Sequence, residues 1–113
     1  MEMPAAAAAL SALGHEPRLK VFRMLVRAGP AGMSAGDIAR VTGVVQNTLS
    51  SYLSGLSHAG LVASRRAGRS IIYSADYTRI GELLAFLVED CCQGDATVCA
   101  PAFARIGQSA GRR

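Results

Sequence analysis

The chain has 113 residues, which suits a single domain, and half of them are hydrophobic, enough for one packed core. The formal net charge of +4 and the isoelectric point of about 9.4 favour a polyanionic partner such as nucleic acid. The uncharged, alanine-rich stretch at residues 3–15 is shorter than the roughly 20 apolar residues of a spanning helix and lacks a basic start. We therefore expect no membrane segment or signal peptide, and predict a cytoplasmic protein.

Two helices are predicted in the first 30 residues. Residues 4–14 are rich in alanine, which favours a helix, and Gly14 is expected to end it. Residues 15–30 carry Pro17 in the first turn and end in a Gly-Pro pair, which predicts a second helix. Spacings of three and four predict its buried face: Leu19, Phe22, Leu25 and Val26. Its basic residues are interpreted as solvent charges, one or two of them near phosphate: Arg18, Lys20, Arg23 and Arg27.

A helix-turn-helix pattern follows. Residues 34–43 predict a short helix, with Ser34 and Asp37 as a pair resembling a capping box and Gly43 as a left-handed stop. Residues 44–60 predict a second helix, which Val45 leaves without a side-chain cap. Its apolar stripe is Leu49, Leu53 and Leu56. Two helices joined by a glycine turn are typical of helix-turn-helix proteins.

The pattern then changes to a hairpin and a last helix. Residues 61–75 alternate and contain strand formers, with Ala67-Gly68 as the predicted turn and Gly68 supplying a positive φ. Residues 76–92 predict a helix capped by Asp76, with a wide apolar face: Ile80, Leu83, Leu84, Leu87 and Val88. The predicted fold class is mostly α with a β-hairpin wing (α+β), and a chain this short would gain stability as a dimer.

These segments resemble the ArsR family of winged-helix repressors. The resemblance is carried by HEPRLKVFRMLVRAG, GDIARVTGVVQNTLSSYLSGLSHAGLV and SRRAGRSIIYS, over about residues 10–75. It implies a winged helix-turn-helix domain for DNA binding and dimerisation over residues 1–99, with the last helix at the dimer interface. Residues 100–113 have no strong periodicity, and we expect them to form a loose tail. The ending LVEDCCQG, followed by a third cysteine, is similar to the arsenic-responsive branch.

The chain also departs from the family pattern. Residues 34–43 lack the Cys-x-Cys motif that many arsenic, cadmium and lead sensors carry there, and the last helix lacks the histidines of the zinc-sensing branch. Tyr52 stands where the family often has His, and Val45 where it usually has Ser or Pro. The resemblance thus leaves the C-terminal cysteines as the metal site.

Two sets of side chains are candidates for DNA contact. The second helix of the helix-turn-helix offers hydrogen-bonding groups to base edges in the major groove: Gln46, Asn47, Thr48, Ser50, Ser51 and Tyr52. The wing tip offers cations to phosphates or the minor groove: Arg65, Arg66 and Arg69. The plainer alternatives are a solvated helix face and a solubilising turn.

The only cysteines, Cys91, Cys92 and Cys99, lie within nine residues. Soft trivalent ions such as As(III) or Sb(III) prefer thiolate ligands. Adjacent helical residues point about 100° apart, so the first two can converge only where the helix ends, and Gly94 suits such an end. Residues 93–98 are long enough to return Cys99. The alternatives are buried thiols, a zinc site lacking a fourth ligand, and a redox switch in which Cys99 pairs with either neighbour.

The sequence therefore predicts a homodimeric repressor that binds double-stranded operator DNA when metal-free and releases it on binding As(III) or Sb(III). A repressor that senses oxidants or persulfide through the same thiols is the main alternative, and an architectural DNA-binding protein is a third. No nucleophile, base and orienting group form a recognisable set, and no glycine-rich phosphate loop is present, so no enzymatic activity is expected.

Overall fold

The computed structural model describes residues 1–89 together with Pro101 and Arg105. This part of the chain forms, in order, α1 (Met3–Leu13), α2 (Glu16–Ala28), β1 (Met33–Ser34), α3 (Ala35–Thr42), α4 (Gln46–His58), β2 (Val62–Ala67), β3 (Ser70–Ala75) and α5 (Tyr77–Val88). No helix among the described residues is long and apolar enough to cross a membrane.

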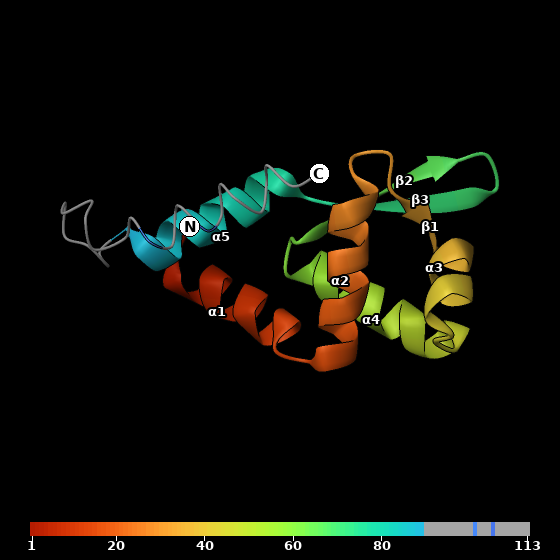
Figure 1. Ribbon diagram of the computed structural model, residues 1–113, viewed down its shortest axis with the longest axis horizontal. Coiled ribbons are helices and arrows are strands. Elements are labelled where there is room, and N and C mark those ends of the chain that lie inside the picture. The colour runs from red at the N-terminus through yellow and green to blue at the C-terminus, as the bar shows by residue number, and fades with distance from the viewer. Residues whose placement is uncertain (90–100, 102–104, 106–113) are drawn as a thin grey trace.

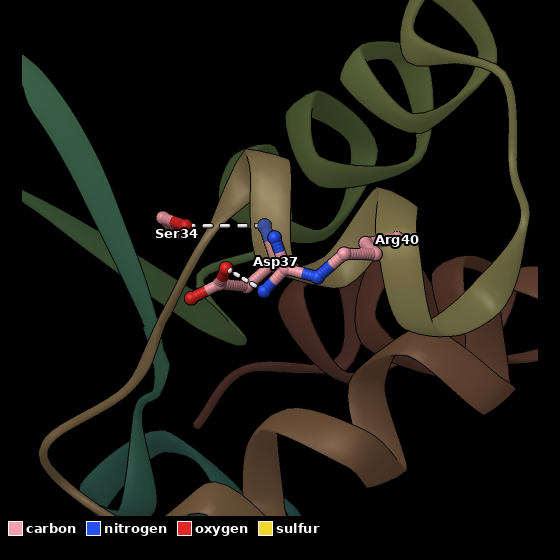
Figure 2. Close-up of polar contacts among 3 residues, drawn as sticks. All are labelled: Ser34, Asp37 and Arg40. Carbon is pink, nitrogen blue, oxygen red and sulfur yellow. Dashed lines mark hydrogen bonds and ion pairs between the residues drawn. The ribbon is translucent and has the colours of Figure 1, made fainter.

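Local side chains set the helix ends as predicted. The Ser34 hydroxyl accepts a hydrogen bond from the Asp37 backbone N–H at 3.1 Å and so caps α3 (Figure 2). The pair forms only this half of a capping box, because the Asp37 carboxylate pairs with Arg40 one turn on and not with the Ser34 N–H. Asp76 caps α5 in the same way, accepting from the Arg79 backbone N–H at 3.0 Å. The start of α4 has no side-chain cap. Glycines end α1, α2 and α3 at the predicted positions, Gly14, Gly29 and Gly43.

One hydrophobic core joins the helices to the base of the wing. The predicted stripe of α4 is confirmed, since Leu49, Leu53 and Leu56 are at most 2% exposed. Alanines fill the α1 contact, where small side chains let the helices approach closely: Ala6, Ala9 and Ala12. Burial of the α4 leucines fixes which face of that helix remains in solvent.

The predicted buried face of α2 was partly wrong. Phe22 and Leu25 are buried as expected, but Leu19 and Val26 are each 37% exposed, and Val21 is buried instead. The buried arc runs through Val21, Phe22 and Leu25, which are related by spacings of three and four, so Leu19 and Val26 fall on its edge. The apolar residues of α2 are numerous enough to form a buried face in two ways. The contacts of α2 with β3 and α4 determine which of the two faces is buried.

The wing is a three-stranded antiparallel sheet in the order β1-β3-β2, where the sequence predicted two strands. The extra strand, β1, has only two residues, and it pairs Met33 with Tyr73 and Ser34 with Ile72. Two residues are too few to show the alternation of apolar and polar side chains that predicts a strand. β1 is recognised only by its pairing with β3. The hairpin turn also differs by one residue, because the ladder closes at Ala67 and Ser70; Gly68 has the predicted positive φ of +63°.

The elements separate into two ends (Figure 1). α1 and α5 contact each other at one end, and α3, the far part of α4 and the hairpin tip lie at the other. α2 stands between them and packs on both α4 and β3. The winged helix-turn-helix therefore projects away from the α1–α5 pair.

Candidate nucleic-acid interface

The turn between α3 and α4 is held by its own polar groups. The Thr42 hydroxyl donates to the Ile38 carbonyl at 2.7 Å and accepts from the Val44 N–H at 3.2 Å. Gly43 takes the left-handed conformation, φ +74°, and donates to the Ala39 carbonyl at 2.8 Å. These bonds set the angle at which α4 leaves α3, so the outer face of α4 is presented by a fixed scaffold.

The outer face of α4 carries most of the predicted DNA-binding set. Five of its six residues are exposed: Gln46, Asn47, Thr48, Ser50 and Ser51. By helical spacing, Asn47 and Ser51 lie opposite the buried leucines, and Ser54 and His58 continue the same row, exposed along the helix. Sequence reasoning missed these last two as candidates, although the spacing of four, three and four residues from Asn47 would have found them.

Tyr52 occupies a different place from the other five. It is half-buried and packs against the core, and its ring centroid lies 5.3 Å from that of His15, just before α2, at an interplanar angle of 58°. Contacts of this kind order both rings. Tyr52 therefore lies at the boundary between the core and the polar face of α4.

The three predicted wing arginines are exposed, but they are not equivalent. The Arg65 Nη2 atom donates to the Ala31 carbonyl at 2.9 Å. Arg66 and Arg69 make no hydrogen bond or ion pair with the described part of the chain. The hairpin tip therefore offers two cations to a polyanion without first breaking an internal contact.

Arg18 was wrongly interpreted as a solvent charge. Its Nε donates to the Ala12 carbonyl at 2.6 Å, near the end of α1, and its guanidinium lies against Gly55 of α4. A cation at the carbonyl end of a helix is favourable because it meets the negative end of the helix dipole. Arg18 thus joins α1 to α4. Lys20 forms an exposed ion pair with Glu16 at 3.7 Å, and such pairs contribute little.

The predicted metalloid ligands, Cys91, Cys92 and Cys99, lie outside the described residues, as does most of the predicted tail at 100–113. The structure describes α5 as far as Val88, followed by Glu89. Within the described part of the chain, no three His, Cys, Asp or Glu side chains are grouped so as to hold a metal ion.

Comparison with known proteins agrees with this geometry. Residues 13–65 match a family described as a helix-turn-helix domain. The HTH-type transcriptional regulator YgaV of Escherichia coli is 34% identical over 87 residues, which cover 77% of this chain and 86% of YgaV. An ArsR-like transcriptional regulator from Rhodococcus sp. RHA1 superposes with a TM-score of 0.72 at 27% identity, covering 86% of this chain and 89% of that one.

A third similarity concerns the fold alone. The winged helix-turn-helix DNA-binding domain of Mb0332 from Mycobacterium bovis, described as homodimeric, superposes with a TM-score of 0.64 at 24% identity, covering 80% of this chain and 82% of that one. The activity named for YgaV and the Rhodococcus protein is regulation of transcription, not catalysis. The matches to YgaV and to the Rhodococcus protein each extend over more than three quarters of this chain. The chain belongs to the ArsR family of winged helix-turn-helix transcriptional regulators.

Proposed function

We propose that this protein is a homodimeric repressor that binds operator DNA in its metal-free form and releases it on binding As(III) or Sb(III). The observation that carries the DNA-binding half is the row of exposed polar side chains on α4, held rigidly by three buried leucines and flanked by a basic wing. The inducer half rests on the chemistry of the three thiols that follow α5.

In the DNA complex, α4 lies in the major groove with Asn47 and Ser51 at the centre of its contact face. An asparagine amide can bond the N6 and N7 groups of adenine at once, which makes Asn47 the main sequence-reading residue. Arg66 and Arg69 contact phosphates of the DNA backbone. These contacts fix the position of the protein on the duplex but do not depend on the base sequence.

The dimer forms through the end of the molecule opposite the wing. Several large apolar side chains there are exposed in the single chain: Met3, Leu10, Leu84 and Leu87. A second copy that covers this surface would bury α1 and α5 against their equivalents and aim the two α4 helices at the same side of a duplex. Half-sites about 10 base pairs apart, arranged as a palindrome, follow from that two-fold symmetry.

The inducer acts at the end of the dimer helix. Cys91 follows Val88, the last residue of α5, by three positions, so an ion held by Cys91, Cys92 and Cys99 would act directly on the packing of α5 in the dimer. Release requires that the ion favour a dimer whose α4 helices no longer match the half-site spacing. The coupling is reciprocal, so operator DNA weakens As(III) binding by the same factor.

A fluorescence anisotropy titration tests the inducer. A labelled duplex selected from a random-sequence pool is bound by the reduced protein and titrated separately with arsenite, zinc, cadmium and hydrogen peroxide. We expect release near stoichiometric arsenite and none with zinc. Cys91→Ser should keep its DNA affinity and lose the response, whereas the neighbouring control Gln93→Ala should retain both.

Other outcomes of this titration have definite meanings. Release by peroxide alone would assign the same cysteines to a redox or persulfide switch and overturn the metalloid proposal. A Cys91→Ser protein that still releases DNA with arsenite would remove that residue from the site. A Cys99→Ser protein that still responds to methylated trivalent arsenicals would show that two thiolates suffice.

A further inference from the structure

The three arginines of the wing lie on different sides of the hairpin. Successive residues of a strand point to opposite faces of a sheet, so Arg65 and Arg66 of β2 point in opposite directions. Arg65 lies opposite Ile72 in the ladder and Arg66 opposite Ile71. Arg69 follows Gly68 in the turn. A single phosphate backbone therefore cannot be met by all three side chains in the same way.

Arg65 reaches across the sheet to a separate loop. Strand β2 is at one edge of the sheet and β1 at the other, with β3 between them. The Arg65 guanidinium nevertheless donates to the carbonyl of Ala31, which lies just before β1 in the loop from α2. A charged donor strengthens this bond relative to one between neutral groups.

The same loop is tied to the wing at two further points. Met33 and Ser34 pair with β3, and Gly32 lies so close to it that an added Cβ would clash with the Tyr73 carbonyl oxygen. The loop therefore connects the end of α2, which packs in the core, to the hairpin. This connection adds to the direct contacts that β3 makes with α2 and α3.

We propose that Arg65 is a positioning residue, which holds the wing against the loop between α2 and β1 so that Arg66 and Arg69 meet the phosphates. Arg65 itself makes no phosphate contact in the complex. The inference rests on the proposed DNA binding. The two roles differ in their effect on salt dependence. Only a side chain that neutralises a phosphate, as proposed for Arg66 and Arg69, adds to the salt dependence of binding.

The salt dependence of binding separates the two roles. The full-length reduced protein is titrated by anisotropy onto a mixed-sequence duplex of about 30 base pairs, long enough for two half-sites, at several salt concentrations. We expect Arg66→Met to lower the slope of log K against log salt by about 1.8 for the dimer, about 0.9 for the one phosphate that each subunit no longer neutralises. Arg65→Met should weaken binding roughly fivefold per subunit, the effect of one lost hydrogen bond in each, with the wild-type slope. Arg65→Lys, which keeps a long side chain with a donor, should recover most of the affinity.

Amide hydrogen exchange tests the anchor without DNA. The Gly32 N–H, which donates to the Gly29 carbonyl at 3.0 Å, reports on the loop, and the Gly43 N–H, which donates to Ala39 at 2.8 Å, is the reference. We expect Arg65→Met to speed exchange at Gly32 roughly fivefold, and Arg66→Met to leave it unchanged, with Gly43 constant in both.

Three results would overturn the inference: a loss of slope in Arg65→Met equal to that in Arg66→Met, unchanged affinity in Arg65→Met, or unchanged exchange at Gly32. Failure of the wild-type protein to bind any duplex would instead refute the proposed function. The exchange measurement would then still decide whether Arg65 holds the loop.

Discussion

At the scale of single residues, Gly32 and Gly43 show how surroundings decide the role of a glycine. Both have positive φ, +73° and +74°, a conformation that costs other residues about 1–2 kcal/mol. Nothing lies within 4 Å of a Cβ added at Gly43, whereas one added at Gly32 meets backbone and side-chain atoms of β3. Gly43 is needed for its backbone angle alone, and Gly32 also for close approach.

Alanine substitution should separate these two requirements. Gly43→Ala should lower the free energy of unfolding by about 1 kcal/mol, and Gly32→Ala by about 3 kcal/mol or more, because it adds a clash with the Tyr73 carbonyl to the backbone strain. Urea denaturation at equilibrium measures both. Equal losses in the two variants would show that the loop moves away from β3 at little cost.

In the proposed complex, Asn47 is the side chain that contributes most to recognition of the DNA sequence. Asn47→Ala should weaken binding to a selected duplex about 10-fold to 100-fold, while binding to a scrambled duplex of equal length stays constant. The matched control is Ser57→Ala, which changes another exposed side chain of α4 about a quarter of a turn away from the row of Asn47. If the Asn47 variant lost affinity equally for both duplexes, the residue would contribute to binding without reading bases.

At the scale of elements, contacts between residues close together in the sequence could be predicted, and contacts between distant residues could not. The caps of α3 and α5 involve residues three apart, and the α4 stripe repeats every three or four residues, so the sequence alone predicted them. The Arg65 bond joins residues 34 apart, and β1 exists only through pairing with β3. Single-sequence patterns contain no information about such pairs.

The candidate site divides in the same way. Exposure of the polar face of α4 follows from the buried leucines, which is why five of its six predicted residues were correctly placed on the surface. The half-burial of Tyr52 depends on His15 in another segment, and the distinct role of Arg65 depends on Ala31. Both of these contacts join residues that are far apart in the sequence.

At the scale of the whole molecule, the proposed dimer assigns a partner to the apolar end formed by α1 and α5. Of the predicted α5 face, Leu83 is buried within the chain, while Leu84 and Leu87 are 47% and 46% exposed. The periodicity predicted one wide apolar face. The structure divides it into a part that packs on the chain's own core and a part that is exposed, which the proposed dimer would cover.

Charge placed on that end should dissociate the dimer. Leu87→Glu should give a monomer in sedimentation equilibrium and weaken binding to a palindromic duplex roughly 100-fold or more, because the two half-sites are no longer bound together. Ile71→Glu, at the equally exposed Ile71 of β3, should remain a dimer. An unchanged mass for Leu87→Glu would place the interface elsewhere.

The most direct test of the central claim, that α4 reads DNA as part of a dimer, is the specificity ratio of the wild-type protein. Anisotropy at one fixed salt concentration compares a selected palindromic duplex with a scrambled duplex of the same composition. We predict preference for the palindrome by about 1000-fold or more, with two protein chains bound per duplex. A ratio near one would contradict the claim, since binding would then depend only on charge.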